Sequence, residues 1–506
     1  MKNAGLGLIV LFFAVLTACG GGGGSSNDNN PPPPPPVVVN ANVAVHATTN
    51  GSFDLAMSTS FQPAEWDDTF FCTPGACAPQ TWSTARTTSL GNLQPHHVRL
   101  QTVSQGVPQS ATSTWDFSVL DAITQPVLSV GDNSPEMQLG WAPTFMWSNG
   151  SAGGTLDVNA FTAYAQNMVR YYNTGGFTAP DGTHVSPSSN PITYWGILNE
   201  PSINNITSAS QYTQIYNQVV PAMKTVDPNI KFAALELCCG TENWVSTFAQ
   251  NVTAQVDVLA AHYYSSCNQK DTDTKVFGTV PGFGTAVQTI YSNMSTNPSL
   301  ANVPVWITEN NVNADFSSST GMSTCNPGQP FVTDQRGTSA FFAAWRPYVF
   351  SEVGKAGAHA LYHWDFDADT QYGEVNYNNG QKMLSYWVDY WLGQYFPAGS
   401  GQMLLNFTNS DNADLEVLPV MNADGSVVIM VSNHAVVSPT DNNGAGLTAD
   451  IAIDTSALGT FSSASELMMD SNTNPTLGPV SFQISPTSPV KISMNGYSVA
   501  FIKLVP

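Results

Sequence analysis

The sequence contains little positive charge. Lys and Arg total 14 residues against 36 Asp and Glu, so the formal net charge is −22 at pH 7. A nucleic acid would be repelled, because no basic stripe offsets this acidic excess, and we expect no nucleic-acid partner. Charged residues make up only 10% of the chain and hydrophobic residues 42%, which indicates a folded protein whose polar share is mostly uncharged. Such a composition suits a neutral ligand rich in hydroxyl groups.

Long apolar runs and nucleotide-binding glycine motifs are missing as well. The apolar run at residues 6–16 is too short to cross about 30 Å of hydrocarbon as a mature helix, and no second run of bilayer length follows. The chain has no G-x-G-x-x-G turn and no Walker loop. These absences disfavour a membrane-spanning protein and a nucleotide-binding open sheet.

Cysteine is scarce, and the first of the seven stands at an informative position. Lys2, the apolar run and the segment Leu16-Thr17-Ala18-Cys19 have the order of a bacterial export signal. The four residues resemble the lipobox of bacterial lipoproteins, in which cleavage leaves the cysteine as the lipidated first residue. We therefore expect a signal peptide at residues 1–18, lipidation at Cys19, and a protein anchored to the membrane by its lipid alone, at the cell surface or in the periplasm.

Residues 19–40 are expected to form a tether, because five glycines are followed by a polar stretch and six prolines. An even number of cysteines remains, which permits disulfides in an exported chain. Cys72 and Cys77 are the natural local pair. The pairing of the other four stays open, and no Cys-x-x-Cys motif or nearby histidine suggests a metal site. These four are Cys238, Cys239, Cys267 and Cys325.

From about residue 95, short apolar runs alternate with amphipathic stretches, which is typical of parallel strands each followed by a covering helix. Eight such units close into a (β/α)₈ TIM barrel whose site lies at the carboxyl ends of the strands, although an open sheet is an alternative. We expect the barrel at residues 41–397. The expected strands lie within 45–60 and at 97–101, 126–130, 192–198, 232–237, 256–261, 303–308 and 358–363.

After a helix-like stretch at residues 384–396 the pattern changes. Short alternating segments follow, separated by turns rich in Asn, Gly and Pro. This pattern predicts a C-terminal β-sandwich domain at residues 398–506.

Two glutamates stand at the ends of expected strands. Glu200 lies in an Asn-Glu-Pro motif after the fourth strand, and Glu309 follows the seventh. In a barrel both carboxyl groups would therefore face the same mouth. Cleavage of a glycosidic bond requires such a pair: a protonated acid for the leaving oxygen and a carboxylate at the anomeric carbon. The sequence therefore predicts Glu200 and Glu309 as catalytic residues.

These motifs resemble clan A of the glycoside hydrolases, retaining (β/α)₈ enzymes with Asn-Glu-Pro after strand four and a second Glu after strand seven. Within the clan the chain is most similar to the family 39 type, which includes β-xylosidases and iduronidases. The resemblance implies that Glu200 is the acid/base, Glu309 the nucleophile, and Asn199 the group that binds the 2-hydroxyl of the sugar. It also implies double displacement on an oligo- or polysaccharide of plant or microbial origin, with neither a cofactor nor a metal.

Four further side chains match positions of the same pattern. His262 and Tyr264 take the places of the clan's sixth-strand pair, Arg99 matches a guanidinium near the nucleophile, and Trp364 lies where the clan places an aromatic floor. We expect all four to bind or orient substrate. Contact of the tyrosine hydroxyl with the nucleophile would keep that carboxylate ionised. Gln101 stands where the family usually has His, which is a departure from the pattern.

Other interpretations remain at this point. Glu236 is a rival carboxyl, but it lies inside its strand rather than at the end. Asp365, Asp367 and Asp369 form a D-x-D-x-D run that lacks the later glycine and glutamate of a calcium loop, so we expect an acidic loop. The functional alternatives are an endo-acting glucanase, xylanase or mannanase of another clan A family, and a non-catalytic glycan-binding surface lipoprotein.

Overall fold

The computed structural model describes residues 38–62, 82–102, 106–130, 134–150, 154–186, 190–318, 320–377, 379–410 and 413–506. The predicted lipidation site Cys19 and the predicted pair Cys72 and Cys77 lie outside these residues. Residues 38–506 form one compact unit. Among the helices of the described residues, none combines the length and the apolar character that crossing a bilayer requires.

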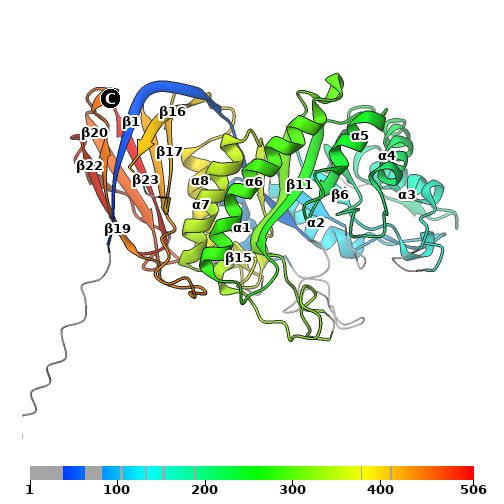
Figure 1. The fold of residues 1–506 in the computed structure, drawn as a ribbon. Coiled ribbons are helices and arrows are strands. Elements are labelled where there is room, and N and C mark those ends of the chain that lie inside the picture. Colours follow the sequence, from blue (N-terminus) through cyan, green and yellow to red (C-terminus); the bar gives the residue numbers. More distant parts are fainter. Residues whose placement is uncertain are drawn as a thin grey trace, which may run out of the picture. The chain divides into compact units, whose positions relative to one another are not determined.

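Eight parallel strands close into a barrel (Figure 1), as the alternation of apolar and amphipathic segments predicts. Within the barrel, the two longest strands are β11 and β12. They are neighbours, and they place His262 opposite Glu309. In order around the barrel the strands are β2 (Ala56–Phe61), β3 (Val98–Gln101), β6 (Glu136–Leu139), β9 (Tyr194–Ile197), β10 (Lys231–Leu237), β11 (Val258–Ser266), β12 (Val305–Asn313) and β13 (Ala360–His363).

A helix follows each strand of the barrel. Several of these helices begin at a Ser, Thr or Asp whose side chain accepts a hydrogen bond from the first turn, as Asp157 does from the backbone N–H groups of Asn159 and Ala160. Their apolar stripes are buried against the strands. The helices are α1 (Thr84–Leu93), α2 (Ser118–Val130), α3 (Val158–Asn173), α4 (Ala209–Lys224), α5 (Trp244–Asn251), α6 (Asp273–Met294), α7 (Ala340–Lys355) and α8 (Leu384–Tyr395).

Short elements decorate the loops. They comprise three two-stranded sheets and four 3₁₀ helices within the described part of the chain. The sheets are β4 (Gln109–Ala111) with β5 (Thr114–Trp115), β7 (Phe177–Thr178) with β8 (His184–Val185), and β14 (Asp367–Ala368) with β15 (Val375–Asn376). The 3₁₀ helices are η1 (Thr144–Met146), η2 (Pro298–Leu300), η3 (Gln335–Gly337) and η4 (Ser456–Leu458).

The C-terminal segment forms a second, nine-stranded sheet with its own apolar core. Neighbouring residues on its strands alternate between this core and the core of the barrel: Val417 belongs to the former, Leu418 and Val420 to the latter. In order the strands are β21 (Phe482–Ile484), β20 (Ser463–Met469), β23 (Ser498–Val505), β18 (Val427–Asn433), β17 (Leu415–Met421), β16 (Gln402–Asn409), β1 (Val38–Phe53), β19 (Thr448–Asp454) and β22 (Val490–Met494).

One expected strand and one expected boundary differ from the structure. Residues 126–130 lie in α2, and the third barrel strand is β6; a short apolar run does not by itself distinguish a strand from a buried helical turn. The first barrel strand, β2, coincides with the end of the segment 45–60 where a strand was expected, but the barrel does not begin at residue 41, because β1 pairs with β16 and β19 of the nine-stranded sheet. The N-terminal strand β1 is therefore part of the C-terminal sheet.

One buried carboxylate links α6 to the loops of the nine-stranded sheet. Asp273 accepts hydrogen bonds from the backbone N–H groups of Asn443 and Gly444, both at 2.8 Å, and from the Tyr497 hydroxyl at 3.0 Å. We predict that Asp273→Ala lowers the free energy of unfolding by about 3 kcal/mol or more, because several donors then stay buried without a partner. Urea denaturation of this variant measures the loss.

The matched control is Lys275→Ala, two residues further along the same helix. Its ammonium group is largely exposed and pairs with Asp271, so its removal should change the free energy of unfolding by less than about 1 kcal/mol. Equal losses in the two variants would contradict a special role for Asp273.

Candidate active site

A cleft of about 920 Å³ opens at the carboxyl ends of the barrel strands. Most of the side chains that the sequence singles out line it: Asn199, Glu200, His262, Tyr264, Glu309 and Trp364. Arg99 is fully buried and contacts Glu309 and Asn199 from below. The fold therefore brings all seven predicted site residues together, although they are spread over more than half of the chain.

Glu200 is placed by a tight turn at the end of β9. The backbone has left-handed φ values at Leu198 (62°) and at Glu200 (43°), which non-glycine residues adopt at a cost. Backbone hydrogen bonds from Ile203 and Asn204 to the Glu200 carbonyl close the turn, and Pro201 prevents the strand from continuing. The strain is concentrated at the residue whose carboxyl group enters the cleft.

Both carboxylate oxygens of Glu309 are held. Arg99 donates from Nη1 to Oε1 at 3.0 Å, and the Tyr264 hydroxyl donates to Oε2 at 2.8 Å. Burial raises the pKa of Glu309, while the charges of His262 and Arg99 and the bond from Tyr264 oppose that rise. The contact of the tyrosine with this carboxylate is the one that the resemblance implies.

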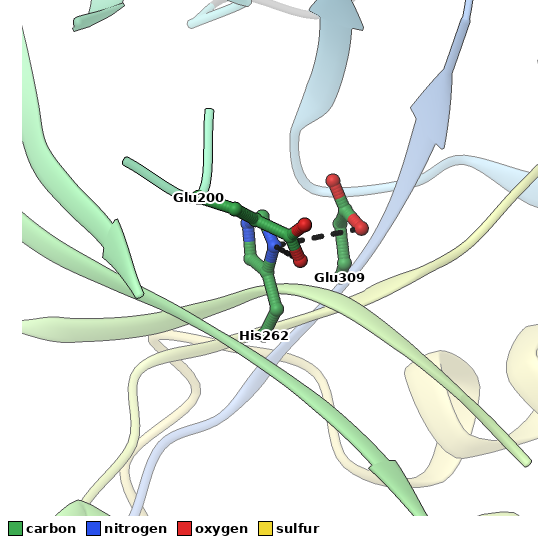
Figure 2. Close-up of side chains that lie close together, drawn as sticks. All are labelled: Glu200, His262 and Glu309. Atoms are coloured by element: carbon green, nitrogen blue, oxygen red, sulfur yellow. Dashed lines mark hydrogen bonds and ion pairs between the residues drawn. The ribbon is translucent and has the colours of Figure 1, made fainter. Parts of the chain in front are cut away.

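The ring of His262 contacts three carboxyl groups, and Figure 2 shows two of them, those of Glu200 and Glu309. Its Nδ1 is 2.9 Å from Oε1 of Glu200 and 3.5 Å from Oε2 of Glu309, and its Nε2 is 2.9 Å from Oε2 of Glu236. Burial by itself lowers the pKa of His262, but Glu309, Glu200 and Glu236 outweigh it and raise the pKa to about 10. At neutral pH the ring is therefore protonated and donates from both nitrogens.

A buried layer of charge supports these residues. Arg99 also donates from Nη2 to Oδ1 of Asn199 at 3.1 Å and to Oε2 of Glu236 at 3.3 Å. Burial alone would lower the pKa of Arg99, but Glu236, Glu309 and Glu136 raise it. The Thr308 hydroxyl adds a bond of 2.7 Å to Glu236. Burial would raise the pKa of Glu236; Arg99 and His262 outweigh it and lower the pKa, so this carboxylate is ionised.

Glu236, which the sequence offers only as a rival carboxyl, is thus part of this buried layer. It is fully buried and does not line the cleft, so it does not meet substrate. It nevertheless contacts both cations beneath the cleft, His262 and Arg99. The sequence does give one signal for Glu236: it lies inside an otherwise apolar strand. A charge in such a position is buried only when it is paired.

The side chain of Asn199 is oriented by two donors. Its Oδ1 accepts from Arg99 at 3.1 Å and from Nε2 of Gln138 at 3.0 Å. Since the oxygen is engaged on the protein side, the Nδ2 group is left to donate into the cleft. This is the orientation that a hydroxyl acceptor on a sugar requires.

One wall of the cleft contains a disulfide whose pairing could not be deduced from the sequence. Cys267, just after β11, is bonded to Cys325 in the loop after β12, with the two Cα atoms 5.7 Å apart. Cys238 and Cys239 are free thiols, and all four cysteines line the cleft. The loops that shape this wall are therefore tied to each other by a covalent bond.

Two sets of described side chains have the atom types and spacing of a metal site: Glu200 with His262 and Glu309, and His363 with Glu374 and Asp389. In each set both nitrogens of the histidine face oxygen acceptors within 2.9 Å. Hydrogen bonds to the histidine nitrogens therefore account for the close approach of the atoms in both sets.

The D-x-D-x-D run lies directly after β13, next to Trp364 of the cleft, and two of its carboxyl groups are buried. Asp365 and Asp367 are buried, and Asp367 pairs with Arg86 at 3.2 Å. Pairing with a buried cation allows such a carboxylate to leave the solvent.

Comparison with known proteins agrees with this geometry. Residues 146–329 match the family model described as "Glycosyl hydrolase catalytic core". None of the curated proteins matches the chain. The family match and the barrel together support a glycoside hydrolase with a carbohydrate substrate.

Solved structures of the same fold include three glycosidases. The GH51 arabinofuranosidase from Xanthomonas axonopodis pv. citri is 12% identical, with a TM-score of 0.64 over 92% of this chain and 100% of that chain. GH30 xylanase C from Talaromyces cellulolyticus is 15% identical, with a TM-score of 0.59 and the same coverage. A GH39 β-xylosidase from Caulobacter crescentus is 14% identical, with a TM-score of 0.56 and the same coverage. At these identities the likeness shows the fold.

We predict that Tyr264→Phe lowers kcat/KM for glycoside hydrolysis by roughly 10- to 100-fold, the loss expected for a hydrogen bond to a charged group. The hydroxyl lowers the pKa of Glu309, so its removal raises that pKa and leaves more of the carboxylate protonated in acid. The acidic limb of the pH profile of kcat/KM should therefore move to higher pH.

Tyr263→Phe is the control for this variant. Tyr263 is the preceding residue and also lines the cleft, but its hydroxyl has no hydrogen-bond partner among the residues that the structure describes. Its removal should leave the acidic limb in place. An unchanged limb in Tyr264→Phe would contradict the role of that hydroxyl.

Proposed function

We propose that the protein is a retaining glycoside hydrolase that acts by double displacement. The observation that carries the proposal is the spacing of the two carboxyl groups: an oxygen of Glu200 and an oxygen of Glu309 lie within 4.8 Å of each other. Retaining enzymes hold their carboxyl groups about 5–5.5 Å apart, whereas inverting enzymes leave about 6.5–9.5 Å for a water molecule. The spacing found here favours retention.

In the first step, Glu200 gives its proton to the leaving oxygen while Glu309 attacks the anomeric carbon and forms a glycosyl ester. Arg99 and Tyr264 fix the two oxygens of the nucleophile, so its approach needs little reorganisation. In the second step, Glu200 takes a proton from water, the water attacks the same carbon, and Glu309 leaves as a carboxylate. The protonated His262 holds Glu200 in place during both steps.

The lining of the cleft supports a neutral sugar as substrate. Among the described residues that line it, Lys275 is the one lysine or arginine, and its Nζ lies 2.8 Å from Oδ1 of Asp271. A uronic acid would therefore meet no unpaired cation on these residues. Amides such as Gln62 and Gln101, and the indoles of Trp141 and Trp364, suit hydroxyl groups and apolar sugar faces.

The size of the cleft favours a second candidate beside a family 39-like β-xylosidase. About 920 Å³ is near the upper end of the roughly 300–1,000 Å³ that small ligands occupy. An endo-acting glucanase, xylanase or mannanase would fill such a cleft with several sugar units. A non-catalytic glycan-binding protein is less well supported, since stacking and hydrogen bonding need no pair of carboxylates at this spacing.

Substitution of each glutamate tests the proposed roles. We predict that Glu200→Ala lowers kcat/KM on a polysaccharide by about 10²–10⁴-fold, while activated aryl glycosides, which need no acid, lose less. Azide should restore turnover and give a glycosyl azide of retained configuration. Glu309→Ala should lose turnover on all substrates, and azide should then give the inverted product. Product analysis on xylan, mannan, β-glucan and aryl glycosides measures these outcomes.

Glu242→Ala is the matched control, because Glu242 lines the same cleft but has no part in the contacts among Arg99, His262 and Glu309. Its kinetics should stay within about threefold of the unsubstituted protein, as for a surface charge. Similar losses in Glu242→Ala and Glu200→Ala would refute the assignment of the acid/base.

We also propose that the protein is exported and anchored by lipid at Cys19. The disulfide between Cys267 and Cys325 supports an oxidising compartment. In a bacterium that processes lipoproteins, Cys19→Ala should release the protein from the membrane fraction, and incorporation of labelled fatty acid should cease. Retention of Cys19→Ala in that fraction would contradict anchoring through this residue.

A further inference from the structure

Cys238 and Cys239 are consecutive cysteines at the mouth of the cleft, directly after β10. Cys238 is buried and Cys239 is exposed, and both line the cleft together with Glu200 and His262. Nothing in the proposed mechanism uses either of them.

The local backbone holds the pair in this position. Cys239 has a left-handed φ of 60°, which a residue with a side chain adopts only at a cost. Gly240, which follows, has a φ of 74°. Thr241 fixes the turn, since its hydroxyl and its backbone N–H both donate to the Cys238 carbonyl, at 2.6 and 3.2 Å. The turn therefore holds two consecutive cysteine side chains at the edge of the cleft.

The cysteine pair lies on the side of the cleft that belongs to the acid/base. The Thr241 hydroxyl, which donates to the Cys238 carbonyl, lies 3.5 Å from the hydroxyl of Ser202, and Ser202 is in the turn that carries Glu200. An acid/base residue contacts the oxygen of the leaving group. The wall next to it therefore borders the leaving-group part of a substrate.

We propose that Cys238 and Cys239 close to a vicinal disulfide, whose ring forms an apolar wall for the leaving-group part of the substrate and is opened by mild reduction. The existence of the bond is independent of the proposed hydrolase function, whereas its role as a wall rests on it.

The chemistry of closure is a thiol–disulfide exchange. The exposed Cys239 thiolate attacks an external disulfide, such as oxidised glutathione, and displaces one thiol. The Cys238 thiolate then attacks Sγ of Cys239 in the mixed disulfide and displaces the second thiol. Two electrons pass to the external disulfide, and the protons of the two cysteines end on the two released thiols.

The pair should be easier to reduce than the other disulfide of the cleft. Consecutive Cα atoms are about 3.8 Å apart, below the usual range of about 4.4–6.8 Å for disulfides, so a vicinal bond is strained. The Cα atoms of Cys267 and Cys325 are 5.7 Å apart, within that range. Strained and exposed disulfides are the labile ones.

Redox titration of the full chain tests the bond. The protein is equilibrated in glutathione buffers from oxidising to reducing, quenched with acid and N-ethylmaleimide, and mapped by mass spectrometry. We expect the peptide with Cys238 and Cys239 to be unlabelled and lighter by two hydrogens in oxidising buffer. As the buffers become more reducing, both of these thiols should become labelled before Cys267 and Cys325 do. Labelling of both thiols in every oxidising buffer would overturn the proposal.

Kinetics of the two redox forms tests the wall. We expect reduction to raise KM several-fold for substrates with a long leaving group and to leave small aryl glycosides unchanged. The Cys238→Ser/Cys239→Ser double variant should be insensitive to reductant, while Cys267→Ser/Cys325→Ser should keep the sensitivity. An unchanged KM, or sensitivity that follows Cys267 and Cys325, would overturn the role of the pair as a wall.

Failure of the hydrolase proposal is distinguishable from both results. In that case neither redox form cleaves any glycoside, and the mass map still decides whether the bond forms. The affinities of the oxidised and the reduced protein for xylan and β-glucan oligosaccharides, measured by calorimetry, then test whether the disulfide forms a wall. Opening of the disulfide must weaken binding on that side of the cleft. Equal affinities would contradict it.

Discussion

The site depends on the pairing of buried charges beneath the cleft. Arg99 and the protonated His262 lie among the carboxylates of Glu236, Glu309 and Glu200, contributed by or adjoining different strands of the barrel. A charge without a partner is costly to bury, so each ion tolerates burial only because the others are in place. The same pairing raises the pKa of Arg99 and of His262 and lowers the pKa of Glu236, so these three groups are charged.

The charged and polar residues of the site form two layers, one beneath the cleft and one that lines it. Glu236 and Arg99 never reach the cleft, yet they hold His262, Asn199 and Glu309, which do. The lower layer therefore orients the upper one, and the upper layer supplies the carboxyl groups that meet the substrate in the mechanism that we propose. A strained turn at Glu200 and the long neighbouring strands β11 and β12 bring the upper layer to the mouth of the barrel.

Much of the fold and of the cleft could be predicted from the sequence, because strand periodicity and short motifs at strand ends are local signals. Glu200 and Glu309 follow apolar runs whose ends must meet in any eight-stranded barrel. Residues 126–130 were misassigned because a short apolar run fits a helix as well as a strand. The barrel was expected to begin at residue 41 because strand partners distant in sequence, such as those of β1, leave no local trace. Glu236 and the bond from Cys267 to Cys325 likewise depend on contacts that only the folded chain reveals.

The central claim is that Glu309 becomes covalently bonded to the sugar. The most direct test is mass spectrometry of the protein lacking residues 1–36 after incubation with a panel of 2-deoxy-2-fluoro glycosides, which slow the breakdown of a glycosyl-enzyme. The account predicts an adduct on the peptide that contains Glu309, and its absence in Glu309→Gln. An adduct on another residue, or turnover that inverts the anomeric centre without any adduct, would contradict it.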